Sequence, residues 1–118
     1  MIISKKCTFD AAHHLPGYPG KCKNLHGHTF FVEVSVMGDK NQETGMVVDF
    51  KDLSDFLKNN VVEAFDHNEL NKFFRMPTAE NIAQFILAKL YFWCANKNID
   101  PYSVKVWETP DSCVEIRC

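Results

Sequence analysis

The chain has 118 residues, of which 46% are hydrophobic and ten are phenylalanine, and its formal net charge is −2. This length and composition fit one domain with a single core, and the near-neutral charge excludes the strong basic field of a nucleic-acid-binding protein. No apolar run approaches the length of a membrane span and residues 1–12 lack the pattern of an export signal, so we expect a cytoplasmic protein with no membrane partner.

Two segments near the amino terminus alternate between apolar and polar residues, as half-buried strands do. Residues 2–13 show this alternation, and residues 26–37 show it more cleanly. Between them, residues 15–24 hold two prolines and two glycines and are predicted to form a loop. After a polar turn, residues 46–48 are expected to pair back on the second strand as a hairpin.

The middle of the chain has the spacing of two amphipathic helices. Asp49 is predicted to cap a helix that runs to about Phe65, and Thr78 is predicted to cap a second helix. Two short strands are expected near residues 103–108 and 113–117. The order strand, strand, helix, helix, strand, strand predicts an α+β fold with both helices on one face of an antiparallel sheet.

The five cysteines form no Cys-x-x-Cys pair, so a disulfide framework is not expected. Most of them are predicted to be small buried hydrophobic residues. Cys22 stands apart because it lies in the predicted loop between Lys21 and Lys23, where cations favour the reactive thiolate. It is a candidate base or nucleophile, against the alternative of an inert thiol.

Three histidines fall where two strands can bring them together. His26 and His28 share one strand face, and His13 lies on the apolar face of its own strand while His14 lies on the polar face. If the strands pair, His13 converges with the other two, and a β-bulge before His13 would select His14 instead. Three histidines without an obvious fourth ligand are typical of a catalytic zinc site. A structural zinc site with Cys22 as fourth ligand and a cluster without metal are the alternatives.

Two further groups carry possible chemistry. Asp66 and His67 are adjacent at the end of the first predicted helix, where they form either a simple helix cap or a proton-shuttling pair. Glu108 shares a strand face with Val104 and Val106 and should point toward the core. A buried carboxylate is costly unless it is paired, so Glu108 is either part of a buried salt bridge or an anchor for the N–H groups of a ligand.

These motifs occur in one order along nearly the whole chain, and together the sequence resembles the 6-pyruvoyl-tetrahydropterin synthase / 6-carboxytetrahydropterin synthase family. The resemblance treats residues 1–118 as one such domain. It implies the tunnelling fold, a four-stranded antiparallel sheet backed by two helices, with subunits joined into trimeric barrels and two trimers stacked as a homohexamer. The matching segments are Phe9-Asp10-Ala11-Ala12-His13, Cys22 to His28, Val48-Asp49-Phe50, Asp66-His67 with Leu70-Asn71, Pro77-Thr78-Ala79-Glu80-Asn81, and Glu108-Thr109.

The resemblance also implies a role for each candidate residue. Cys22 would be the base at the substrate side chain, and Asp66 with His67 would form an acid/base pair that reaches the site across a subunit seam. Glu108 would hold the pterin ring, with Thr78 as a helper. The zinc ion, Zn2+, would be held by His13, His26 and His28.

The spacing between Cys22 and His26 is similar to that of the queuosine-pathway branch, and Ala79 favours the same branch. This branch converts 7,8-dihydroneopterin triphosphate to 6-carboxy-5,6,7,8-tetrahydropterin with release of acetaldehyde and triphosphate, which is the expected activity. The first alternative is a 6-pyruvoyl-tetrahydropterin synthase, which eliminates triphosphate without breaking a carbon–carbon bond. The second is a non-catalytic, zinc-stabilised pterin-binding module.

Overall fold

Five strands form one sheet in the order β3-β1-β2-β4-β5 in the computed structural model, which describes residues 1–118. The predicted four-stranded antiparallel sheet is present, with one short parallel addition: β3 (Asn68–Glu69) pairs only with Ala11 and Ala12. The four long strands are β1 (Ile2–His13), β2 (His26–Met37), β4 (Asp100–Thr109) and β5 (Ser112–Arg117).

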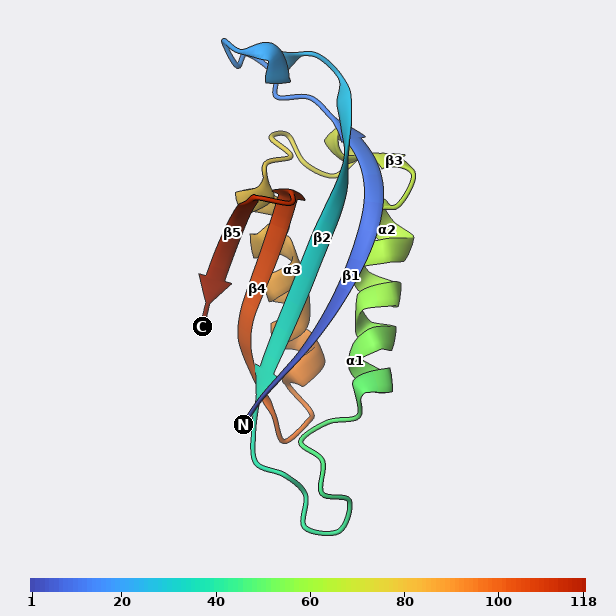
Figure 1. Ribbon diagram of the computed structural model, residues 1–118, viewed down its shortest axis with the longest axis vertical. Coiled ribbons are helices and arrows are strands. Elements are labelled where there is room, and N and C mark those ends of the chain that lie inside the picture. Colours follow the sequence, from blue (N-terminus) through green and yellow to red (C-terminus); the bar gives the residue numbers. More distant parts are fainter.

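The helices cover one face of this sheet, as predicted (Figure 1). The first helical segment consists of α1 (Phe50–Leu57), a π-helical turn η2 (Lys58–Val62) and α2 (Glu63–Phe65). The second is α3 (Ala79–Cys94). α1 packs on β1, and α3 packs on β4 and β5. None of the helices has the length and apolar character needed to cross a membrane.

Both predicted helix caps are confirmed. The side chain of Asp49 accepts a hydrogen bond from the backbone N–H of Lys51, and the hydroxyl of Thr78 accepts one from the backbone N–H of Asn81. These bonds satisfy donors that a helix start leaves unpaired. The cap at Thr78 fixes the segment before α3, which borders the site described below.

The core lies between the helices and the inner face of the sheet, where strand alternation buries every second residue. Phe9 of β1 and Phe30 of β2 are directly paired, and their rings stack with centroids 4.9 Å apart. Phe65 packs on Phe9 from the helical layer. The helices contribute a stripe of buried residues: Leu53, Phe56, Leu57, Val61, Ile82, Ile86 and Leu90.

The predicted hairpin strand at residues 46–48 is wrong. β2 already pairs with β1 on one side and β4 on the other, so it has no free edge for a further strand. Residues 46–48 form no strand and follow a turn in which the side chain of Asn41 accepts from the backbone N–H groups of Glu43 and Thr44. Gly45 completes this turn with a φ of 73°, a left-handed conformation that suits glycine.

Two connections meet at the end of the sheet where β1 ends and β2 begins. The β1–β2 loop contains the short helix η1 (Lys21–Lys23) and is closed by a bond from the Leu15 N–H to the Cys22 carbonyl, 2.7 Å long. The segment that leads to α3 contains β3 and the short helix η3 (Leu70–Lys72). Candidate residues from both connections and from β4 therefore gather at this end.

Candidate functional site

The strand register brings three histidines together. His13 of β1 lies directly opposite His26 of β2, and His28 lies two residues further along the same face of β2. Their ring centroids are 4.6 to 5.1 Å apart. One ligand atom from each ring and one carboxylate oxygen of Glu108 all lie within 4.8 Å of one another. His14 is outside this group, with Nδ1 3.9 Å from a carboxylate oxygen of Glu69.

Backbone carbonyls set the orientation of two of these rings. Nδ1 of His13 lies 2.8 Å from the carbonyl oxygen of Pro77, and Nδ1 of His26 lies 2.7 Å from that of Asn24. A carbonyl oxygen only accepts, so each Nδ1 carries the proton and each Nε2 keeps a free lone pair. A hydrogen bond from the other ring nitrogen to a carbonyl is how proteins orient a histidine that binds a metal.

The cluster fits a divalent cation. Nε2 of His13 and Nε2 of His28 are buried and have no hydrogen-bond partner, although a carboxylate oxygen of Glu108 lies 3.1 and 3.5 Å from them. Because Nδ1 of His13 carries the proton, its Nε2 cannot donate to this carboxylate, and the two lone pairs face one another until a cation lies between them. Three imidazoles and a carboxylate are a donor set that suits Zn2+.

The protonation state of the cluster agrees with metal binding. Burial lowers the pKa of His28 below its usual range. The Glu108 carboxylate opposes this shift, and the rings of His13 and His26 add to it. A neutral imidazole is the form that binds a metal, so burial favours the binding form of His28.

Three predicted residues, Cys22, Thr78 and Glu108, line one cavity of about 380 Å³. Glu108 shares the face of Val104 and Val106, as expected, but its side chain is 35% exposed and lines this cavity instead of being buried in the core. The thiol of Cys22 is not among the grouped ligand atoms. A structural zinc site completed by Cys22 therefore has no support, and the thiol remains available to a bound molecule.

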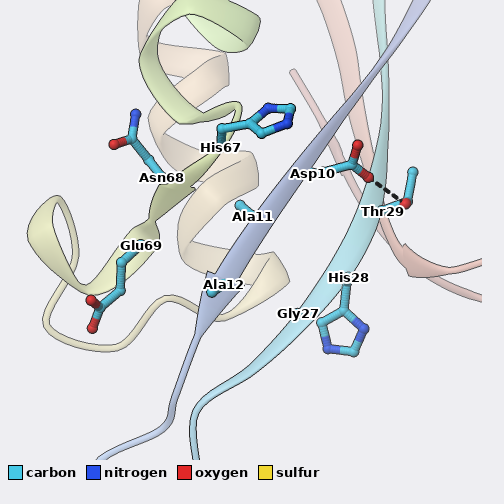
Figure 2. Close-up of a pocket in the computed structure, with 9 residues that line it drawn as sticks. All are labelled: Asp10, Ala11, Ala12, Gly27, His28, Thr29, His67, Asn68 and Glu69. Carbon is cyan, nitrogen blue, oxygen red and sulfur yellow. Dashed lines mark hydrogen bonds between the residues drawn. The ribbon is translucent and has the colours of Figure 1, made fainter.

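His67 lines a second cavity, of about 590 Å³, together with residues of β1, β2 and β3 (Figure 2). Nδ1 of His67 is 2.8 Å from a carboxylate oxygen of Asp66, and the other oxygen accepts from the Asp10 N–H. His67 has a φ of 58°, which is strained for a residue other than glycine. The bond from its N–H to the Asp10 carbonyl holds it there. Its ring is 80% exposed, so the imidazole is presented to solvent rather than used for packing.

The pair shifts both pKa values in the directions a proton shuttle uses. The backbone N–H of Asp10, and then the hydrogen bond to His67, lower the pKa of the Asp66 carboxyl. The hydrogen bond to Asp66, reinforced by its charge, raises the pKa of His67. The arrangement keeps Asp66 ionised and His67 in a defined tautomer.

Comparison with known proteins shows what this chain is similar to. A sequence model of the 6-pyruvoyl tetrahydropterin synthase family matches residues 2–118. The chain belongs to this family.

Individual relatives agree with that assignment. A Haemophilus influenzae protein named 6-carboxy-5,6,7,8-tetrahydropterin synthase is 36% identical over 138 aligned positions that cover 96% of each chain. An Archaeoglobus fulgidus protein, provisionally given the same name, is 44% identical over 99% of this chain and 96% of its own. The structure of Caenorhabditis elegans 6-pyruvoyl tetrahydropterin synthase superposes with a TM-score of 0.87 at 28% identity, covering 100% of this chain and 95% of that one.

Family membership confirms the predicted resemblance and the tunnelling fold of the chain. It also confirms that the chain is an enzyme of the tetrahydropterin synthase type. Within the single chain, however, the candidate catalytic groups are not all brought together. Cys22 lines the cavity beside Glu108, whereas His67 lines the cavity beside Asp10. His28 belongs to the metal cluster and also lines the second cavity, so the histidine cluster lies between the two.

Several residues that shape the site were missed by sequence reasoning. Asp10 holds the Asp66–His67 pair through its backbone, and its carboxylate accepts a hydrogen bond from the Thr29 hydroxyl. The alternation of β1 and β2 indicates that Asp10 and Thr29 both lie on the outer faces of their strands, which is a signal for this contact. The side chain of Asn71 bonds both backbone groups of His14. No signal in the sequence marks the carbonyls that orient the histidines.

Proposed function

We propose that this protein is a zinc-dependent lyase that converts 7,8-dihydroneopterin triphosphate to 6-carboxy-5,6,7,8-tetrahydropterin, releasing acetaldehyde and triphosphate in queuosine biosynthesis. The observation that carries the proposal is the cluster of His13, His26 and His28, with two orphaned buried Nε2 atoms beside a cavity lined by Cys22 and Glu108. The names of the Haemophilus and Archaeoglobus relatives support this branch of the family.

The three histidines would hold the metal through Nε2, because Nδ1 of His13 and Nδ1 of His26 are committed to backbone carbonyls. A cation bound there supplies Lewis acidity toward the hydroxyls of the substrate side chain. The cavity beside the cluster is large enough to be a small-molecule site, at about 380 Å³.

Cys22 would take a proton from the substrate side chain as general base. It lines the cavity without contributing to the metal cluster, which leaves its sulfur free for this role. His67 would deliver or accept the second proton, with Asp66 holding its ring at 2.8 Å.

Glu108 and Thr78 would position the pterin ring in the same cavity. The carboxylate of Glu108 can accept from ring N–H and amino groups. The Thr78 oxygen accepts from the Asn81 N–H, so its own hydrogen remains free to be donated to a ligand.

A second candidate function is 6-pyruvoyl-tetrahydropterin synthesis, which is favoured by the name of the Caenorhabditis elegans enzyme whose structure matches this one. That reaction eliminates triphosphate and leaves the side-chain carbons intact. The two candidates therefore differ in whether acetaldehyde appears.

The test is one incubation of the zinc-loaded protein with 7,8-dihydroneopterin triphosphate, followed by mass analysis and an acetaldehyde assay. We expect acetaldehyde, triphosphate and the 6-carboxy product in equal amounts. Triphosphate with a 6-pyruvoyl product and no acetaldehyde would move the chain to the second candidate. Unchanged substrate at every metal loading would leave the non-catalytic binding module as the better account.

We further propose that the active protein is a cytoplasmic homohexamer, a dimer of trimeric barrels. The separation of Cys22 and His67 into different cavities supports a site completed by a neighbouring subunit. β5 has one unpaired edge, and β3 covers β1 at only two residues, so both ends of the sheet offer strand edges for pairing.

A further inference from the structure

We infer that Tyr18 is a substrate-binding residue, whose phenol ring is held against Gly20 and packs on the face of the pterin ring in the Cys22 cavity. This inference rests on the proposed function, because it takes the pterin as the molecule that fills this cavity. It concerns the loop between β1 and β2 and adds no ligand to the metal.

The first observation is where the Tyr18 side chain lies. The cavity of about 380 Å³ is bordered by the start of α3, by the turn end of the β4–β5 hairpin and by the β1–β2 loop, from which Tyr18 and Cys22 line it. Tyr18 is the one aromatic side chain among the lining residues. Small-molecule sites combine apolar and aromatic walls with a few polar groups that fix orientation. Tyr18 is therefore the residue of this cavity best suited to contact the face of a flat ring.

The second observation is that Gly20 makes room for this ring. A Cβ added to Gly20 would lie 2.8 Å from Cε1 of Tyr18 and 3.4 Å from its Cδ1, whereas two carbon atoms pack best at about 3.5–4.0 Å. The backbone of Gly20 has a φ of −97° and a ψ of −170°, an extended conformation that other residues adopt freely. The backbone does not require glycine at this position, but the Tyr18 ring does.

The third observation is that the loop is held by its own backbone. The N–H of Leu15 donates to the Cys22 carbonyl at 2.7 Å, the N–H of Tyr18 donates to the Leu15 carbonyl at 3.2 Å, and the N–H of Lys23 donates to the Gly20 carbonyl at 3.3 Å. None of these bonds uses a side-chain atom of Tyr18, so the loop does not depend on them being supported by the phenol ring. Tyr18 is also 47% exposed, which leaves much of its surface open to a molecule in the cavity.

These observations assign the Tyr18 ring to binding rather than to packing. The ring is already held in place before a molecule enters, so binding does not have to order it first. Stacking of a flat heterocycle on an aromatic ring is favourable beyond the area that it buries. A polyol without a ring would gain no such contact, so Tyr18 favours molecules that carry the pterin ring.

The first experiment measures the Kd of 6-methylpterin, which has the ring but no side-chain hydroxyls, by quenching of its fluorescence on the zinc-loaded protein. We expect Tyr18→Ala to weaken binding about tenfold, and Tyr18→Phe, which keeps the ring, to change it by less than about threefold. Tyr91→Ala is the matched control, because Tyr91 is exposed on α3 and does not line the cavity. Wild-type affinity in Tyr18→Ala, or an equal loss in Tyr18→Phe, would overturn the inference.

The second experiment tests the contact with Gly20 by a double-mutant cycle. Gly20→Ala should weaken 6-methylpterin binding about threefold when Tyr18 is present, because the new methyl group displaces the ring, and should have no effect in the Tyr18→Ala background. Gly17→Ala is the control for strain in the same loop. Gly17 has a φ of 76° and nothing within 4 Å of an added Cβ, so this substitution should lower the melting temperature equally in both backgrounds. An equal effect of Gly20→Ala on binding in both backgrounds would contradict the inference.

Turnover of 7,8-dihydroneopterin triphosphate separates binding from a structural role. Tyr18→Ala should raise KM about tenfold and lower kcat by less than about threefold, with bound zinc and circular dichroism as in the wild type. Tyr18→Leu, which keeps apolar bulk without a ring, decides the question if Tyr18→Ala does not fold. A fall in kcat at unchanged KM would show that Tyr18 acts on the loop or on the chemical step, and would overturn its binding role.

Failure of the proposed function gives a different result from failure of the inference. A wild-type protein that neither binds 6-methylpterin nor turns over the triphosphate would reject the pterin function, and the binding role of Tyr18 with it. A wild-type protein that does both, together with an unaffected Tyr18→Ala, would reject the role of Tyr18 alone.

Discussion

Among single residues, Cys22 is the one whose loss should separate catalysis from metal binding. Cys22→Ala removes the proposed base but no atom of the histidine cluster. We expect turnover to fall about 10²- to 10⁴-fold, with bound zinc and melting temperature unchanged.

Metal analysis, calorimetry and a turnover assay on the same preparation provide the check. Cys118→Ala, at the exposed carboxyl terminus, controls for general loss of a thiol. Loss of zinc from Cys22→Ala would show that the thiol is a ligand after all.

Asp66 controls the protonation of His67. The protonated imidazole gains both a hydrogen bond and charge attraction from Asp66, which is why the pKa of His67 is raised. Asp66→Asn removes the charge and weakens the bond, so the pKa should fall toward the ordinary value of about 6.5.

An NMR titration of the His67 ring measures this directly, and the limb of the pH–rate profile that reports His67 should move to lower pH in parallel. Asp111→Asn, in the β4–β5 turn, is the remote control. A His67 pKa that does not change in Asp66→Asn would contradict the assignment of the pair.

At the scale of elements, one side chain of η3 is joined to the chain just after the end of β1. Asn71 accepts from the His14 N–H at 3.0 Å and donates to the His14 carbonyl at 2.9 Å. His13 immediately precedes this clamp. Asn71→Ala leaves two partly buried backbone groups without partners, which costs about 1–3 kcal/mol, and frees the end of β1.

We therefore expect Asn71→Ala to lower the melting temperature and to weaken zinc binding about tenfold, as loss of a group that helps to orient a metal ligand does. Denaturant unfolding and chelator competition measure the two effects. Asn59→Ala, an exposed residue of the π-helical turn, is the matched control. Wild-type zinc affinity in Asn71→Ala would show that the clamp does not position the histidine.

Periodicity in the sequence predicted the strands and helices correctly where the periodic pattern is strong. It failed where the pairing of distant segments determines whether a strand forms. The alternation in residues 2–13 and 26–37 predicted β1 and β2 with their observed bounds, because one buried face forces a period of two. The strand expected at residues 46–48 does not form, since β2 is central in the sheet. The helix from Asp49 was predicted as regular, and no pattern in the residues indicated its π-helical turn at Lys58–Val62.

In the candidate site, too, local patterns predicted some contacts, and the pairing of distant segments determined others. Strand faces were enough to choose His13 over His14 as the partner of the other two histidines, because side-chain direction follows from register. The approach of Glu108 to the cluster depends on the pairing of β2 with β4 and on the bulge near Trp107. Contacts of this kind join distant segments, and no local pattern reports them.

At the scale of the whole molecule, the chain holds its candidate groups in two cavities, each of which borders the cluster of His13, His26, His28 and Glu108. If each site uses Cys22 from one chain and His67 from a neighbour, two inactive variants should complement each other. Mixing Cys22→Ala with His67→Ala under conditions that allow subunit exchange should restore roughly one quarter of wild-type activity, since either chain fills each position with equal chance.

Turnover of the exchanged mixture, with mixed assembly verified by native mass spectrometry, measures this recovery. Each variant alone, taken through the same exchange procedure, is the control. A mixture that forms mixed oligomers and stays inactive would show that both groups of a site come from one chain.

The central claim is that the histidine cluster is a metal site required for turnover. Its most direct test is a titration of metal-free protein with Zn2+ while bound metal and turnover of 7,8-dihydroneopterin triphosphate are followed together. We predict that turnover rises in proportion to bound zinc up to one ion per chain, and that His26→Ala neither binds this ion nor gains activity. Full turnover by the metal-free protein, or zinc bound with wild-type affinity in His26→Ala, would contradict the account.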